Sequence, residues 1–335
     1  YDYELNEVFF SELGIRKPDL FLNAAGESAG ETIGKVIIAA EAALVRFKPD
    51  ALLVLGDTNS SLAVIPAKRA KIPIFHMEAG NRCFDARVPE EINRRIVDHT
   101  SDINLTYSSI AREYLLREGF PPDQIIKTGS PMREVLNYYA DGITSSGILG
   151  ELGLEVGKYF VVSAHREENV DSEENLAKII RMVNELANNY GLPIVFSMHP
   201  RTKKRLADLE LTANKLVKFY KPFGFFDYIK LQSEARCVLS DSGTITEESS
   251  ILDFPALNIR EVHERPEGFE EASVIMTGLD SDIVLSALEA LNAKSSEDYR
   301  SLQLVNDYSP DNVSEKVLRI LMSYTGFVNR KVWRK

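Results

Sequence analysis

Short, almost uninterrupted apolar runs alternate with helical stretches along most of the chain. The apolar runs lie at 51–57, 72–78, 103–108, 125–130, 159–165, 193–199, 237–241 and 256–260. Helices are predicted between many of them, for example over 58–70 and 90–100. Runs this apolar are typical of strands buried on both faces, and strands separated by helices are typical of parallel sheets. The sequence therefore predicts an α/β protein built from doubly wound sheets.

The clearest single element is a helix predicted over 173–190. Its apolar side chains recur at helical spacing along one stripe, at Leu176, Ile179, Ile180, Val183 and Leu186. Ser172 is the predicted N-cap, and Gly191 is the predicted C-terminal stop.

Two domains are predicted for a chain of 335 residues. A stretch rich in Gly and Ser at 139–158 is predicted to be the linker, with Rossmann-like domains over 1–145 and 155–320. The basic C-terminal residues, 321–335, are either a solvated end or a helix that packs back on the first domain. Because Tyr1 stands in mid-pattern, we expect the first strand of the N-terminal domain to be missing.

Charge and composition argue against several classes of protein. The net charge of −11 argues against a nucleic-acid-binding surface, so a bound anion must be held by a local set of donors. The two cysteines, Cys83 and Cys237, favour neither a disulfide framework nor a zinc site, and a reducing cytoplasm is expected. No apolar run approaches the roughly 20 residues of a membrane span, and no signal peptide is recognised. No metal-ligand spacing appears, and no G-x-G-x-x-G follows a strand to support a nicotinamide cofactor.

Polar side chains stand at the ends of most predicted strands. They are Asp57, Glu78, Ser108 and Ser130 in the first half, and His165, His199 and Asp241 in the second. Ligands of open parallel sheets bind beyond the carboxyl ends of the strands, where loops and helix N-termini meet. A single Asp or Ser at such a place is often only a helix cap, but capping explains the whole set less well. We therefore expect a ligand site at these strand ends.

Charges of both signs crowd into residues 75–95, directly after a strand that belongs to the core. They are His76, Glu78, Arg82, Asp85, Arg87, Glu90, Glu91, Arg94 and Arg95. A functional cluster is one interpretation. An ion-paired loop followed by a solvated helix start is the structural alternative.

A phosphate-binding turn is predicted within residues 239–250. Ser242, Gly243 and Thr244 lead from a strand into a helix, where exposed N–H groups and the helix dipole suit a phosphate. The acidic pair 247–248 follows in the first turn. Because a carboxylate is repelled by a diphosphate, one of the pair is expected to bind a ribose diol instead. A Ser/Thr cap with favourable first-turn acids is the alternative.

Two further stretches add cations near strand ends. Residues 163–171 include His165 and Arg166, and residues 262–268 include His263, Arg265 and Glu267. Arginine is a natural partner for phosphate oxygens, although surface ion pairing explains each stretch equally well when it is taken alone.

Taken together, these stretches resemble the non-hydrolysing UDP-N-acetylglucosamine 2-epimerase family over nearly the whole chain. The shared motifs are G-D-T at 56–58, H-x-E-A-G-x-R at 76–82, P-E-E-x-N-R at 89–94, the strand-end His165–Arg166, and D-S-G with E-E in 241–248. The sequence looks closest to the branch that forms UDP-N-acetyl-L-fucosamine from UDP-2-acetamido-2,6-dideoxy-L-talose. It departs from the N-acetylglucosamine branch at Glu167, where that branch has Arg, and at Thr244 and Thr246.

The resemblance implies a fold, a reaction and partners. The fold is the glycosyltransferase-B arrangement, in which two Rossmann-like domains face a cleft and the second domain holds most of the UDP. The reaction eliminates UDP to a glycal and adds it back, without a cofactor or a metal. The implied partners are a UDP-sugar substrate and a second copy in a homodimer, and the implied setting is capsule or O-antigen precursor synthesis.

The resemblance also assigns roles to individual residues. Asp57, Glu78 and Glu90 are expected to be the acid–base and cation-stabilising carboxylates, with Arg82 and Arg94 holding them in position. His165, a further catalytic candidate, and Arg166 are expected to face the diphosphate. The other substrate-binding candidates are His199, Asp241, Ser242, Gly243, Thr244, Glu248 for the ribose, and Arg265.

Several other functions remain open at this stage. One alternative substrate is UDP-N-acetylglucosamine itself, converted to its manno epimer. A hydrolysing relative would release UDP and free sugar from the same intermediate. A glycosyltransferase of the same fold would need an acceptor, and a nucleotide-sugar-binding protein would have no turnover.

Overall fold

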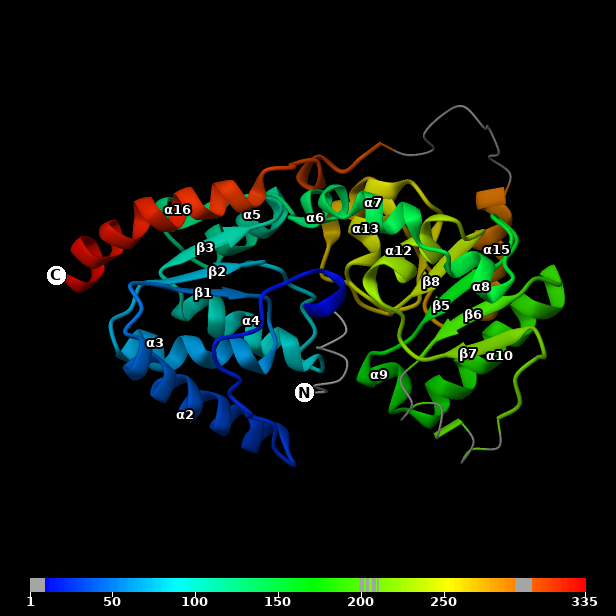
Figure 1. Cartoon of the computed structure of the whole chain (residues 1–335), viewed down its shortest axis with the longest axis horizontal. Helices are drawn as coiled ribbons and strands as arrows, with labels where there is room; N and C mark the ends of the chain where they lie inside the picture. Colours follow the sequence, from blue (N-terminus) through cyan, green and yellow to red (C-terminus); the bar gives the residue numbers. More distant parts are fainter. Residues whose placement is uncertain (1–9, 199–201, 203–204, 207–208, 210, 293–302) are drawn as a thin grey trace. The chain divides into compact units, whose positions relative to one another are not determined.

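The computed structural model describes the whole chain apart from residues 1–9, 199–201, 203–204, 207–208, 210 and 293–302. This part of the chain forms two compact units, described separately below (Figure 1). The first contains Arg16–Glu134 and Asn306–Lys335, and the second contains residues 10–15 and Val135–Val305.

These limits differ from the domain limits predicted from the sequence. The chain passes from the first unit to the second between Glu134 and Val135, inside helix α6 (Met132–Tyr138), and not within a linker at 145–155. Residues 306–320, predicted in the second domain, belong to the first unit.

A parallel four-stranded sheet organises the first unit, with its strands in the order β1-β2-β3-β4. The strands are β1 (Leu52–Leu55), β2 (Ile74–Met77), β3 (Ile103–Thr106) and β4 (Ile125–Lys127). Its helices are α2 (Ala29–Phe47), α3 (Val64–Arg69), α4 (Pro89–Thr100), α5 (Ser109–Arg117) and α16 (Val313–Val328). Short 3-10 turns lie at Asn59–Ala63, Pro122–Gln124 and Asn306–Tyr308, and a π-helical turn lies at Asn329–Trp333.

Helices pack on both faces of this sheet, as the apolar strands predict, but Leu53 and Leu55 of the edge strand β1 are exposed. Ile74 packs among residues of α2, α3 and α4, whereas the next residue, Phe75, packs against α16 on the opposite face (Figure 1). Successive side chains of a strand point to opposite faces, so one apolar run supplies both cores. The returning helix α16 begins at Val313, before the predicted 321–335, and Trp333 beyond it also packs on the sheet.

A parallel six-stranded sheet organises the second unit, with its strands in the order β10-β9-β8-β5-β6-β7. The strands are β5 (Phe160–Ser163), β6 (Ile194–Ser197), β7 (Val217–Tyr220), β8 (Cys237–Ser240), β9 (Ala256–Asn258) and β10 (Ile275–Met276). This is the doubly wound order of dinucleotide-binding domains, and the direction of winding reverses between β5 and β8. That topological switch point is where such sheets bind ligands.

Helices cover both faces of the second sheet. α10 (Glu173–Tyr190) and α15 (Ser281–Asn292) pack on one face, and α8 (Ile148–Leu152), α12 (Phe225–Ser233) and α13 (Ile245–Leu252) pack on the other. The remaining short helices are α7 (Ala140–Ser145), α9 (Glu167–Val170) and α14 (Pro266–Glu270). None of the helices in the described residues combines the length and the apolar character needed to span a membrane.

The prediction for α10 is confirmed in detail. The helix runs from Glu173 to Tyr190, the Ser172 side chain accepts a hydrogen bond from the Asn175 N–H, and Gly191 adopts the left-handed conformation that ends a helix.

The predicted linker at 139–158 is wrong. This segment forms α7 and α8, and Ile148 is buried in the same apolar core as Leu231 of α12. Its glycines serve packing and helix ends, not flexibility: a Cβ on Gly142 would lie 2.8 Å from the Phe226 ring, and Gly153 ends α8 with φ +64°.

Candidate functional site

Two of the predicted carboxylates follow adjacent strands of the first unit. Asp57 comes two residues after β1, and Glu78 directly follows β2; the pairing of Leu55 with Met77 brings both strand ends to one edge of the sheet. The position of a Cβ on Gly56 would be 3.0 Å from Glu78 Oε2, so glycine at this position leaves room for that carboxylate. Glu78 itself has φ +67°, a strained conformation for a non-glycine residue, which is common at functional sites.

Helix α4 fixes the position of Asp57. Arg94 Nε donates to Asp57 Oδ2 at 2.7 Å, and Asn93 Nδ2 donates to the Asp57 main-chain oxygen at 2.9 Å. The Arg94 side chain is almost fully buried, so this ion pair is poorly screened by water. Glu90 lies half-buried in the first turn of α4, four residues before Arg94 and therefore on the same side of the helix.

Arg82 does not have the role predicted for it. Its buried guanidinium donates to Glu118 at 2.8 Å through two nitrogens, to Asp98 at 2.7 Å and to the Asn81 main-chain oxygen. It is a structural cation that joins α4 to the end of α5, whereas the sequence placed it on the catalytic carboxylates. Asp98 and Glu118 were both missed, because neither stands at a strand end.

The second unit presents two loops at its topological switch point. His165 and Arg166 follow β5, and the loop that begins at Asp241 follows β8. The buried Asp241 carboxylate accepts from the main-chain N–H groups of His165 (3.0 Å) and Arg166 (3.0 Å) and from Asn169 Nδ2 (3.0 Å). Asp241 therefore holds one loop against the other, which indicates a positioning role and not the direct ligand contact predicted. The His165 side chain is exposed.

The predicted phosphate turn leads from β8 into α13. Ser242 Oγ lies 3.0 Å from Thr244 Oγ1, and the two residues are half-buried. Thr244, the N-cap residue of α13, makes no capping hydrogen bond through its own side chain, but Ser242 Oγ accepts from the Thr244 N–H at 3.3 Å, so the capping alternative stays open. A Cβ on Gly243 would lie 2.7 Å from Glu264 Oε1, so glycine at this position lets the turn lie close to the Glu264 carboxylate.

A buried network of ions surrounds this turn. Glu264 accepts from Arg166 Nη2 at 3.2 Å and from Arg260 Nη1 at 2.8 Å. Arg265, a predicted substrate ligand, donates to Glu247 Oε1 at 2.5 Å. The sequence did not identify Glu264 or Arg260 as members of this network, which reaches Arg166 only through the distant contact with Glu264.

Glu248, the predicted ribose ligand, is buried in α13. Its Oε2 accepts from Gln232 Nε2 of α12 at 2.9 Å, a partner that the sequence did not reveal. Burial raises the pKa of Glu248, and the hydrogen bonds from Gln232 and Thr244 oppose that rise only in part. His199, also a predicted ligand, lies outside the described residues.

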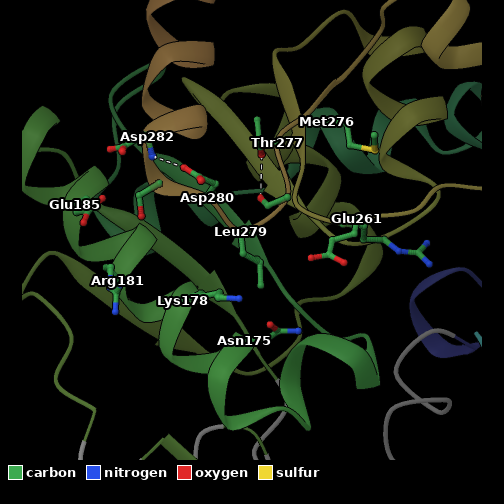
Figure 2. A pocket seen from close by; sticks show the side chains of 13 residues that line it. Asn175, Lys178, Arg181, Glu185, Glu261, Met276, Thr277, Leu279, Asp280 and Asp282 are labelled. Atoms are coloured by element: carbon green, nitrogen blue, oxygen red, sulfur yellow. Dashed lines mark hydrogen bonds between the residues drawn. The ribbon is translucent and has the colours of Figure 1, made fainter. Parts of the chain in front are cut away.

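A cavity of about 670 Å³ lies near the ends of β9 and β10 and contains none of the predicted site residues (Figure 2). Helix α10 contributes Asn175, Lys178, Arg181 and Glu185, and the remaining wall comes from residues 260–261 and 276–282. Cationic and acidic side chains both line it, so its charge favours no single ligand class.

Comparisons with known proteins agree with this architecture. The family model described as "UDP-N-acetylglucosamine 2-epimerase" matches residues 1–322. The chain is similar to a structure of UDP-N-acetylglucosamine 2-epimerase from Rickettsia bellii, with 50% identity and a TM-score of 0.93, covering 99% of this chain and 89% of that one. It is also similar to the Methanocaldococcus jannaschii UDP-GlcNAc 2-epimerase in complex with UDP-GlcNAc and UDP, with 33% identity and a TM-score of 0.88, covering 96% and 89%. A UDP-forming trehalose-phosphate synthase from Burkholderia vietnamiensis, 10% identical with a TM-score of 0.61 over 96% and 82%, shares the fold alone.

Fold, site and comparisons define an α/β enzyme with a glycosyltransferase-B-like fold that acts on UDP-sugars. The chain belongs to the UDP-N-acetylglucosamine 2-epimerase family and is a UDP-sugar 2-epimerase, an isomerase. The names of these relatives match UDP-N-acetylglucosamine, the alternative substrate in the sequence analysis, and not the L-fucosamine branch.

Proposed function

We propose that the protein interconverts UDP-N-acetylglucosamine and its C2 epimer by eliminating UDP and adding it back. The observation that carries this proposal is the pair of adjacent strand ends that bear Asp57 and Glu78, with Asp57 held by Arg94 at 2.7 Å. The matching relatives named for UDP-N-acetylglucosamine support this choice of substrate.

The reaction needs carboxylates because the hydrogen on C2 of the sugar is not acidic. In the proposed sequence, the C1–O bond breaks with both electrons leaving on the UDP oxygen, and positive charge develops at C1. A carboxylate then takes the C2 proton, which leaves a C1=C2 double bond in a glycal. A proton is next delivered to the opposite face of C2, and the UDP oxygen bonds again to C1.

Residues of the first unit supply this chemistry in the proposal. Asp57, Glu78 and Glu90 stabilise the cationic transition state and carry the proton. Arg94 holds the Asp57 carboxylate in place, because moving a catalytic group by about 1 Å costs roughly 100-fold in rate.

Residues of the second unit bind the nucleotide in the proposal. The switch point between β5 and β8 and the N-terminal end of α13 suit the diphosphate, with Arg166 and His165 on the neighbouring loop. Glu248 accepts from the ribose hydroxyls. Its raised pKa supports this role, because a carboxyl with reduced charge repels a diphosphate less.

A second candidate substrate is UDP-2-acetamido-2,6-dideoxy-L-talose, which gives UDP-N-acetyl-L-fucosamine. The observation that favours it is the set of departures at Glu167, Thr244 and Thr246, which lie in the segments that follow β5 and β8, at the start of α9 and of α13. Either product fits a role in capsule or O-antigen precursor synthesis.

The test is to incubate the protein with each UDP-sugar in D₂O, without acceptor, and to follow C2 by NMR. The proposal expects epimerisation of UDP-N-acetylglucosamine with one deuteron at C2. Turnover of the L-talo sugar alone would move the assignment to the second candidate. Release of UDP without re-addition would indicate a hydrolysing enzyme, and no reaction with either sugar would contradict both assignments.

A further inference from the structure

His76 is buried in the sheet of the first unit between two hydrogen-bond acceptors. Its Nδ1 lies 2.8 Å from Asp98 Oδ1, and its Nε2 lies 3.1 Å from the main-chain oxygen of Gly56. The ring is 1% exposed, so water does not replace either contact.

Both contacts require a proton on the histidine. A carboxylate and a carbonyl oxygen only accept hydrogen bonds, whereas a neutral imidazole has a single N–H to donate. A neutral ring would either turn a lone pair toward the Asp98 carboxylate, which is repulsive, or leave the Gly56 oxygen without this donor. The geometry therefore fits an imidazolium with protons on both nitrogens.

The surrounding charges balance that cation. Asp98 Oδ2 also accepts from Arg82 Nη1 at 2.7 Å, and Arg82 pairs with Glu118, so two cations meet two anions. Burial alone would raise the pKa of Asp98, but the hydrogen bonds and charges of His76 and Arg82 hold it below its usual range. From β3, the side chain beside His76 is the uncharged Asn104, which donates to the Asp98 main-chain oxygen.

His76 and Asp98 also contact the two loops that carry Asp57 and Glu78. The carbonyl held by His76 belongs to Gly56, the residue before Asp57 in a turn where φ of Gly56 is +72°. Asp98 also accepts from the Gly80 N–H, two residues after Glu78. A change in this pair would therefore shift Asp57 and Glu78 together.

We propose that His76 is a positioning residue, held as an imidazolium by Asp98, that fixes the Gly56–Asp57 turn in the geometry needed for epimerisation. This inference rests on the proposed function for its effect on turnover, but the protonation of His76 is independent of it. Other charged side chains at this turn are Asp57 itself, Arg94, which donates to Asp57 at 2.7 Å, and Glu78, whose Oε2 faces Gly56.

The first test measures protonation and needs no activity. Protein labelled with ¹⁵N-histidine is studied by NMR at neutral pH, and the signals of the five histidines are assigned by replacing them one at a time. The expected result is protons on both nitrogens of His76, protected from exchange with water. A single protonated nitrogen would overturn the proposal, whether or not the enzyme is active.

The second test separates positioning from general stability. His76→Gln is expected to lower kcat 10- to 100-fold while KM and the Kd for UDP change less than about twofold, since misplacement near 1 Å has an effect of this size. The matched control is His99→Gln, an exposed histidine of α4 that contacts Glu118 at 3.3 Å and is expected to keep kcat within twofold. Unchanged kcat in a folded His76→Gln protein would overturn the proposal. If this variant does not fold, the NMR result on the unmodified protein still decides the proposal, because a singly protonated His76 overturns it and a doubly protonated His76 supports it.

Discussion

Arg94 on α4 and Asp57 after β1 form a partly buried ion pair of 2.7 Å between residues 37 positions apart in sequence. Arg94 is nearly inaccessible to water, whereas Asp57 is partly exposed. The arginine therefore contacts the carboxylate from the protein interior and leaves part of it open to solvent. The pair therefore fixes a group that a ligand reaches.

Replacement of Arg94 by Gln should reduce turnover without preventing UDP binding. The change removes the charge that holds Asp57 and leaves two acidic neighbours, Asp57 and Glu91, without it. We expect kcat to fall roughly 100-fold, measured with the UDP-sugar that the wild type converts. Arg95→Gln is the control, since Arg95 pairs with the same Glu91 from an exposed position. A turnover within threefold of wild type for Arg94→Gln would contradict this assignment.

Replacement of Glu248 by Gln should stabilise the fold at high pH while weakening UDP binding. An acid whose pKa is higher in the folded protein contributes stability at low pH and loses it as pH rises through its folded pKa. Gln does not titrate, so the Tm of the variant should exceed that of wild type by a margin that grows from pH 4 to pH 8. The Kd for UDP should rise at least tenfold if the ribose contact is lost. A Tm difference independent of pH would contradict the charge argument, and unchanged UDP affinity would contradict the ribose role.

Replacement of Asp98 by Asn should destabilise the first unit most at neutral pH. The pKa of Asp98 is lowered in the folded protein, so its contribution is present above the ordinary value of 3.8 and is lost as pH falls below it. Removing one partner of a buried ionic network costs about 3–5 kcal/mol. Chemical unfolding at pH 7 and near pH 3 measures the effect, which should shrink in acid. Asp123→Asn removes an exposed partner of Lys331 and is expected to change little at either pH. An equal loss at both pH values would count against the ionised form.

Replacement of Gly268 by Ala should destabilise the second unit through a steric clash. The added Cβ would lie 1.9 Å from Thr246 Cγ2, so α14 and α13 must move apart, and Arg265 must move with them. Overpacking of this kind costs about 1–3 kcal/mol. Gly150→Ala in α8 is the control, because nothing lies within 4 Å of its added Cβ and alanine favours a helix. A Gly268→Ala protein as stable as wild type would show that the two helices separate without cost.

The sequence predicted those features that depend on local patterns. The stripe of apolar residues, together with Ser172 and Gly191 as end signals, predicted both ends of α10 at the residues where the structure has them. Strands were found wherever a run was almost continuously apolar, but β7, which contains the exposed Lys218, and β10, with two residues, were missed. The linker prediction failed because Gly142 and Gly153 were taken as signs of flexibility, whereas one allows packing and the other ends a helix.

The candidate site was predictable only where its residues follow strands. Asp57 and Glu78 stand at neighbouring strand ends, and parallel pairing alone places them together. The family resemblance led us to expect Arg94 beside a catalytic carboxylate, but the partners of Arg82 were not predictable, because its pairing with Glu118, 36 residues away, depends on the packing of α5. Gln232 and Glu264 were missed for the same reason.

The most direct measurement of the central claim is C2 deuterium incorporation in D₂O by Asp57→Asn and Glu78→Gln beside the wild type. Each variant removes one charge and keeps nearly the same shape. The account predicts that turnover and deuterium incorporation fall by a factor of 100 or more in both variants, while UDP affinity and Tm stay close to wild type. Turnover and incorporation near the wild-type rate in both folded variants would contradict it.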